Sequence, residues 1–239
     1  MAYYNRDIER FKLKKSKREF VGHGGWSTIY RYGDIAFKSY CPDTDTHYKI
    51  KPEVFDVLKG IDNRHLIKLY DIYTTISMFS LFKERAIELA FNVQAYTAKY
   101  YENDSIDILY QPTDYILENF KELEQLFEIL TNNRILTVDI HPNNSILQKN
   151  NIVIIDPDMF SFSEEDRESL SYMNKINLIN LLEKLIVDNR YTLAGRGFYE
   201  KVTNDLIDFK ISSSTDMTYE LSKRLKNVKR PIDLFNKLR

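Results

Sequence analysis

The chain of 239 residues contains a single cysteine, Cys41, so it cannot form a disulfide within itself. It also lacks the run of about 18 apolar residues needed to cross a bilayer, because its most apolar stretch, Ile176–Val187, is interrupted by asparagine and lysine. The start, MAYYNRDIERFKLKK, contains no apolar segment typical of a signal-peptide core. We therefore expect a cytoplasmic protein that is not inserted into a membrane.

The chain also lacks an excess of charge of either sign. Lys and Arg number 34 and Asp and Glu number 35, giving a net charge of -1. No overall field would draw such a protein to nucleic acid, so we expect no nucleic-acid partner. The four histidines are widely separated and give no zinc spacing, so we expect oxygen ligands for any metal. These histidines are His23, His47, His65 and His141.

The first hundred residues predict an antiparallel sheet with one helix. Phe20–Lys38 is rich in β-branched and aromatic residues, with Gly33-Asp34 placed as a turn, which predicts a β-hairpin. After Pro52, apolar residues recur at helical spacing and predict a short helix. The apolar and aromatic segment Leu66–Tyr101 predicts more sheet. We assign residues 1–100 to a first domain.

The remaining chain, residues 101–239, predicts a mainly helical domain. It begins at the linker-like YENDSID, Tyr101–Asp107. Two helices are expected from apolar spacing, and Asn151–Ile155 predicts a short buried strand between them. The apolar positions of the first helix are Leu123, Leu126, Phe127 and Leu130, and those of the second are Ile176, Leu178, Ile179, Leu182 and Leu185. The expected fold class is therefore α+β.

Glycine is scarce, with seven in the whole chain, yet three of them fall at Gly22, Gly24 and Gly25. Such a loop lets the main chain approach phosphate oxygens closely, although a glycine-rich turn without a ligand is an equal alternative. A dinucleotide-binding loop would be followed by a helix, whereas a hairpin is expected here. A P-loop would continue with Lys and Ser or Thr, whereas Trp26 follows Gly25.

A second cluster of polar residues lies in the expected helical domain. Asp139 is followed five positions later by Asn144, and the apolar strand after a short loop ends in Asp156. Carboxylate and amide oxygens are ligands that Mg²⁺ prefers, and Mg²⁺ lets triphosphate oxygens lie beside carboxylates. The alternative is that these residues cap helices or form turns.

Together these motifs resemble the protein-kinase superfamily in their order along the chain. The glycine-rich loop corresponds to Gly22-His23-Gly24-Gly25-Trp26-Ser27-Thr28-Ile29, and the V-A-I-K lysine motif to Ile35-Ala36-Phe37-Lys38. The resemblance implies a bilobal kinase-like fold that binds ATP and Mg²⁺. It implies ATP contacts from Gly22, His23, Gly24, Gly25, Ser27, Ile29, Ala36 and Lys38. It also implies catalytic roles for Asp139, Lys38 and Glu53, with Glu53 as the helix glutamate that holds Lys38 toward the phosphates, and metal binding by Asn144 and Asp156.

The departures from the family pattern keep three functions open. Thr137-Val138 stands where His-Arg is usual, and Pro157-Asp158 stands where Phe-Gly is usual. The loop D-I-H-P-N-N, with His141, is similar to that of aminoglycoside, choline and sugar phosphotransferases. We expect an atypical Ser/Thr protein kinase, with a small-molecule phosphotransferase and a nucleotide-binding pseudokinase as alternatives. The acceptor is an unidentified protein or small molecule.

Overall fold

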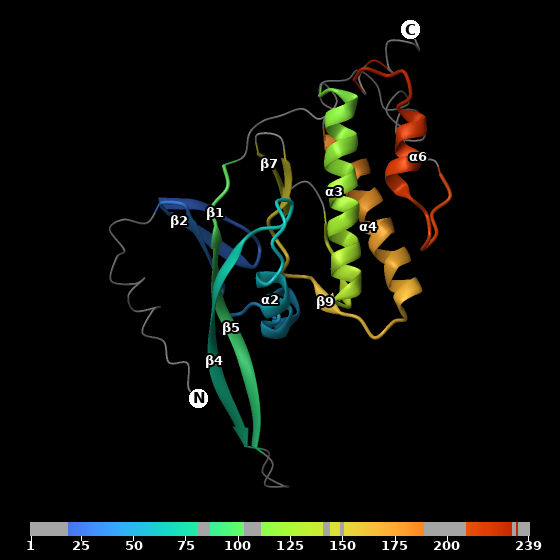
Figure 1. Ribbon diagram of the computed structural model, residues 1–239. Coiled ribbons are helices and arrows are strands. Elements are labelled where there is room, and N and C mark those ends of the chain that lie inside the picture. The colour runs from blue at the N-terminus through green and yellow to red at the C-terminus, as the bar shows by residue number, and fades with distance from the viewer. Residues whose placement is uncertain are drawn as a thin grey trace. The chain divides into compact units, whose positions relative to one another are not determined.

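The computed structural model describes residues 19–80, 87–102, 111–140, 144–148, 151–188, 209–230 and 233 (Figure 1). Within these ranges the protein is mixed α+β. The elements in chain order are β1 (Glu19–His23), β2 (Ser27–Tyr32), β3 (Ile35–Tyr40), the 3-10 helix η2 (Thr46–Tyr48), α2 (Pro52–Lys59), β4 (Leu69–Ser80), β5 (Ile87–Lys99), α3 (Thr113–Asn132), β6 (Ile135–Leu136), β7 (Ser145–Gln148), β8 (Asn151–Ile154), β9 (Ser161–Phe162), α4 (Arg167–Asp188) and α6 (Met217–Arg224).

The chain divides into two compact units. The N-terminal unit contains Met1–Asp62 and Ile67–Tyr101, and the C-terminal unit contains Asn63–Leu66 and Glu102–Arg239. The middle of the loop between α2 and β4, Asn63–Leu66, therefore belongs to the C-terminal unit, whereas the residues on both sides of it belong to the N-terminal one.

The N-terminal unit is built on a five-stranded sheet in the order β1-β2-β3-β5-β4. Every neighbouring pair is antiparallel, which confirms the predicted sheet. Tyr32 pairs with Ile35, so Gly33 and Asp34 form a two-residue turn. Gly33 has φ of 60° and is the first residue of this turn, the position at which a type II′ hairpin requires glycine.

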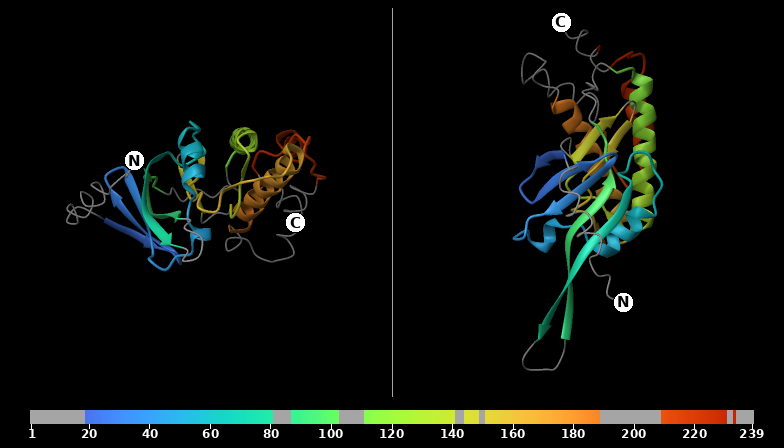
Figure 2. Two further views of the ribbon diagram at one scale, coloured as in Figure 1. Left: turned by 90° about the horizontal axis from the view of Figure 1, so that it is seen from below. Right: turned by 90° about the vertical axis from the view of Figure 1, so that its left-hand side faces the viewer.

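Strands β4 and β5 are much longer than the other three. They pair from Leu69 opposite Ala98 to Ser80 opposite Ile87, whereas β3 pairs only with the last five residues of β5, Ala95–Lys99. The far part of this hairpin therefore continues beyond β1, β2 and β3 as a two-stranded ribbon, as Figure 2 shows.

Helix α2 packs through one face, as its apolar spacing predicts. Pro52 occupies its first turn, where the missing N–H of proline costs nothing. Val54, Phe55 and Leu58 are buried. The Phe55 ring lies 6.2 Å from that of Tyr96 on β5, so the helix is held against the sheet by aromatic contact.

The C-terminal unit is built on α3, α4 and α6, with α3 in contact with both other helices (Figure 1). The predicted apolar face of α3 is confirmed, because its four leucine and phenylalanine positions are at most 2% exposed. Helix α4 begins at Arg167, nine residues before the apolar stretch that predicted it. Its start is capped by Asp166, whose Oδ1 accepts from the amide of Ser169 at 2.8 Å.

The segment Asn63–Leu66 is fixed within the C-terminal unit by His65, which is fully buried. The imidazole Nδ1 lies 2.8 Å from the carbonyl oxygen of Ile152, and Nε2 lies 3.0 Å from Oε2 of Glu122. The amide of Ile154 donates to the carbonyl of His65 at 2.9 Å. His65 therefore joins α3 to β8, the strand that leads to Asp156.

Candidate functional site

The glycine-rich turn joins β1 to β2 and is closed by a hydrogen bond from the Gly24 amide to the Ser27 carbonyl at 2.8 Å. None of its three glycines has a positive φ, since Gly33 is the only described glycine that does. A Cβ would meet nothing within 4 Å at Gly22 or Gly25 and only a backbone oxygen at 3.9 Å at Gly24. The turn's own conformation and packing do not require glycine, which leaves close approach of a ligand as a reason for it.

Four of the predicted ATP-binding residues share one face of the sheet. Ile29 is directly opposite Lys38, and Ser27 is opposite Tyr40. Directly opposed residues lie on the same face, as do residues two apart along a strand. Ser27, Ile29, Ala36 and Lys38 therefore form one surface next to the glycine-rich turn. His23, at the end of β1, is exposed, with Nδ1 3.1 Å from the hydroxyl of Thr28.

Lys38 lies on β3, between β2 and β5, and is only 7% exposed. Its Nζ lies 5.9 Å from the ring centroid of Tyr96 and 6.0 Å from that of Tyr40. Lysine is among the residue types that are almost never buried without a specific interaction. The burial of this ammonium group therefore favours a functional role over an ordinary surface position.

Glu53, the predicted partner of Lys38, lies in the first turn of α2, and its residue is exposed. No ion pair joins the two side chains within the described part of the chain. The helix turns Val54, Phe55 and Leu58 inward, so Glu53 points away from that buried face. The structure does not bring this predicted pair together.

Trp26 extends from the tip of the glycine-rich turn and stacks on Tyr48 of η2. The two rings are 4.4 Å apart and inclined by 4°. The carbonyl of Trp26 accepts hydrogen bonds from the Cys41 amide at 2.9 Å and the Thr44 hydroxyl at 2.8 Å. The contacts of Trp26 therefore anchor the turn, and the spacing of the glycines did not predict this anchoring.

In the C-terminal unit, Asp139 has an unusual backbone conformation, with φ of 60°. Two other described non-glycine residues have positive φ, Arg134 and Asn227, and both follow helix C-termini, where this conformation is common. Asp139 lies in the loop between β6 and β7, so helix termination does not account for it. Such strained residues cluster at functional sites, and surrounding contacts must hold them in place.

The side chain of Asn144 provides one of these contacts. Its Nδ2 donates to the backbone oxygen of Asp139 at 2.9 Å and to Oδ2 of the same residue at 3.1 Å. A backbone oxygen only accepts, so Nδ2 must face Asp139. Oδ1 of Asn144 then remains as an acceptor, which is the atom that a metal ion would use.

A buried hydrogen-bond network holds the segment that leads to Asp139. Oδ1 of Asn174 on α4 accepts from both the amide and the hydroxyl of Thr137, each at 2.9 Å. Its Nδ2 donates to the hydroxyl of Thr131 and to the carbonyl of Ile135, also at 2.9 Å. Asn177 donates to the carbonyl of Thr137. Thr137 and Asn174 are 0% and 1% exposed, so solvent does not compete for these bonds.

Asn174 and Asn177 are functional candidates that sequence reasoning did not select. The signal was the presence of asparagine next to the apolar positions of this helix. Buried polar groups are nearly always hydrogen-bonded, so an amide on such a helix indicates a specific partner. The sequence did not indicate which partner.

The β7–β8 hairpin brings Asp156 into the same region. Ser145 pairs with Ile154, and the carbonyl of Asn144 accepts from the amide of Ile155 at 2.9 Å. Asp156 is the next residue, and its Oδ1 accepts from the amide of Asp158 at 3.3 Å. The structure therefore groups Asp139, Asn144 and Asp156, whereas His141 lies outside the described residues.

The oxygens of Asn144 and Asp156 fit the chemistry of Mg²⁺ as a partial ligand set. No group of three or more His, Cys, Asp or Glu able to hold a metal occurs in the described ranges. Mg²⁺ at phosphotransfer sites is usually held by one or two carboxylates together with substrate phosphates and water. Two protein ligands are thus enough when a nucleotide supplies the others.

A scan of protein-family models gives no match to this chain, and a search of curated proteins gives none either. None of the described helices combines the length and apolar character needed to span a membrane.

Proposed function

We propose that the protein is an ATP- and Mg²⁺-dependent phosphotransferase of the protein-kinase type, acting on a Ser or Thr hydroxyl. The observation that carries this proposal is the strained Asp139, hydrogen-bonded to Asn144 and grouped with Asp156 by the β7–β8 hairpin. Asp139 would orient the acceptor hydroxyl, and Asn144 and Asp156 would hold Mg²⁺, which neutralises charge on the phosphates. Support from the N-terminal unit comes from the buried Lys38 and the glycine-rich turn.

In this mechanism the protein residues position and stabilise charge. Lys38 would pair with the α- and β-phosphate oxygens, and the glycine-rich turn would cover them with backbone N–H groups. Asp139 would accept the hydroxyl proton as that oxygen attacks the γ-phosphorus and the bond to the leaving ADP oxygen breaks. Glu53 has no support from the geometry as the ion-pair partner of Lys38.

The test is incubation of the purified protein with Mg²⁺ and ATP labelled at the γ-phosphate. We expect label on the protein itself or on an added protein substrate, and its loss in Asp139→Asn. Asparagine tolerates positive φ, so this variant retains the loop conformation. Glu165→Gln, a change in an exposed side chain, serves as the matched control. Absence of label from every protein, with the wild type folded, would contradict the proposed acceptor class.

A small-molecule phosphotransferase is the second candidate, favoured by the short connection after Asp158. Only residues 159–166 lie between Asp158 and α4, which begins at Arg167, and they include the two-residue strand β9. This connection offers little surface for a protein substrate. ATP turnover stimulated by a protein-free metabolite extract, without protein labelling, would favour this candidate.

A further inference from the structure

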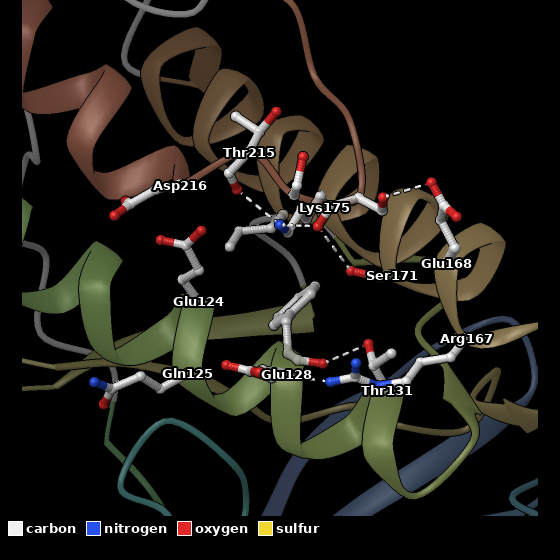
Figure 3. Close-up of a pocket in the computed structure, with 14 residues that line it drawn as sticks. Glu124, Gln125, Glu128, Thr131, Arg167, Glu168, Ser171, Lys175, Thr215 and Asp216 are labelled. Carbon is white, nitrogen blue, oxygen red and sulfur yellow. Dashed lines mark hydrogen bonds and ion pairs between the residues drawn. The ribbon is translucent and has the colours of Figure 1, made fainter.

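The C-terminal unit contains a cavity of about 770 Å³ between α3, α4 and the loop before α6 (Figure 3). This volume is within the range of small-molecule binding sites. Its deep part includes Phe127 and Leu178, which are 2% and 1% exposed. The remaining lining is mostly polar or charged. The cavity therefore suits a small ligand with many hydrogen-bonding groups.

Three carboxylates from three different elements provide acceptors. Glu168 on α4 accepts from the Ser213 hydroxyl through Oε1 at 3.0 Å, and Asp216 accepts from the Tyr219 amide through Oδ1 at 2.7 Å. Oε1 of Glu128 on α3 lies 3.8 Å from Nη2 of Arg167. In the described part of the chain, no donor contacts the second oxygen of any of these carboxylates. Each one retains acceptor capacity at the cavity.

Lys175, on α4 like Glu168, provides a donor. Its Nζ donates to the carbonyls of Ser213 and Thr215, at 2.5 and 2.7 Å, and Figure 3 shows it between α4 and this loop. An ammonium group carries three N–H donors, so one remains after these two bonds. No carboxylate forms an ion pair with Lys175 among the described residues. The cavity thus presents a cationic donor as well as carboxylate acceptors.

The carboxylates and cationic side chains of the lining together limit the kind of ligand that the cavity can bind. The four carboxylates of the lining would repel a simple anion; the fourth is Glu124, whose oxygens already accept from Met217 and Thr218. Lys175 and Arg167 oppose the approach of a simple cation. A hydroxyl group both donates and accepts, so it can pair with either kind of wall. Hydrogen bonds from neutral hydroxyls to charged groups are also stronger than those between two neutral groups. We propose that this cavity binds a neutral, hydroxyl-rich small molecule of the sugar or polyol class.

The cavity is separate from the site around Asp139. No lining residue belongs to that site, although the Thr131 hydroxyl, which lines the cavity, accepts from Asn174. The proposal does not depend on phosphoryl transfer, and its test uses binding alone. A failure of the proposed enzymatic activity would therefore leave this inference intact, and the reverse also holds.

The experiment is titration of the full chain with a panel of neutral monosaccharides and cyclitols, followed by amide NMR and calorimetry. We expect millimolar or tighter binding, with shifts confined to α3, α4 and the loop before α6. Glu168→Gln and Glu128→Gln should each raise the Kd about tenfold, because each weakens a charge-assisted hydrogen bond. Asp114→Asn, an exposed change on α3 outside the cavity, should leave the Kd unchanged.

Three results would overturn the proposal. The first is the absence of localised shifts with every member of the panel at millimolar concentration. The second is tighter binding of spermidine or inorganic phosphate than of the neutral panel at these residues, which would show that charge selects the ligand. The third is an unchanged Kd in both Glu variants. Lys175→Met also removes the bonds to the loop, so the two Glu variants remain the decisive ones.

Discussion

Replacement of Asn174 by alanine tests whether the buried network holds the loop that carries Asp139. The side chain makes four hydrogen bonds, two to Thr137, one to Thr131 and one to Ile135. A buried hydrogen bond contributes about 1 kcal/mol net, and an unpartnered buried group costs about 1–3 kcal/mol. We expect Asn174→Ala to lower the free energy of unfolding of the C-terminal unit by about 3–4 kcal/mol.

The smaller change Thr137→Val removes only the hydroxyl contact and should cost about 1 kcal/mol. The assay is urea unfolding followed by far-UV circular dichroism, which reports the helices of the C-terminal unit. The only tryptophan, Trp26, lies in the N-terminal unit, so its fluorescence gives an internal reference for that unit. Asn132→Ala, at an exposed amide on α3 with a single bond to Arg167, is the control.

The same variant should also affect phosphoryl transfer if the proposed function holds. Thr137 lies two residues before Asp139, whose conformation depends on surrounding contacts. We expect kcat to fall at least tenfold in Asn174→Ala, with the affinity for ATP changed much less. A loss of stability below about 0.5 kcal/mol, the range of ordinary surface substitutions, would refute the reasoning about the network.

Three further predictions concern other parts of the protein. Mg²⁺ and ATP should change the fluorescence of Trp26, and Tyr48→Ala should shift the starting spectrum by removing the stacked ring; no change with nucleotide would count against binding at the glycine-rich turn. Burial opposes ionisation of Glu122, but hydrogen bonds from His65 and Arg64 outweigh it and lower the pKa of Glu122 below the ordinary 4.5. The stabilising contribution of this carboxylate is therefore present above that pH and lost on acidification. Glu122→Gln should therefore be about 1 kcal/mol less stable at neutral pH, with a shallower loss below pH 4.5, in chemical unfolding across pH; parallel curves would refute this. Gly33→Ala should cost about 1 kcal/mol in urea unfolding followed by Trp26 fluorescence, because φ is 60° there, and an unchanged midpoint would contradict the turn assignment.

The sheet and the helix faces were predictable because they depend on local patterns. The Gly33-Asp34 turn and its flanking strands were identified from residue type, and the register confirms them. The four apolar positions on α3 recur at helical spacing, and all are buried. Each inference needed only neighbouring residues.

Long-range placement was not predictable in the same way. The contact between Asn174 and Thr137 joins residues 37 positions apart, so it depends on how α4 packs against the loop after β6. Likewise, the anchoring of Asn63–Leu66 in the C-terminal unit depends on Glu122 and Ile152, far along the chain. Local sequence patterns carry no information about such partners.

At the candidate site, one feature was predictable from the sequence and another was not. The resemblance of D-I-H-P-N-N to a phosphotransferase loop placed Asp139 and Asn144 in one loop, and hydrogen bonds join the two residues. Glu53 was selected for its position on a predicted helix, but position alone did not fix its direction. The buried face of α2 is occupied by its apolar residues, which leaves Glu53 exposed.

The most direct test of the central claim is calorimetric titration with a non-hydrolysable ATP analogue, with and without Mg²⁺. The proposed function predicts Mg²⁺-dependent binding to the wild type that is weakened about tenfold or more by Lys38→Met and by Asp156→Asn, because each removes a charged contact to the Mg²⁺-nucleotide. Binding of equal strength in all three proteins, or binding unaffected by Mg²⁺, would contradict it.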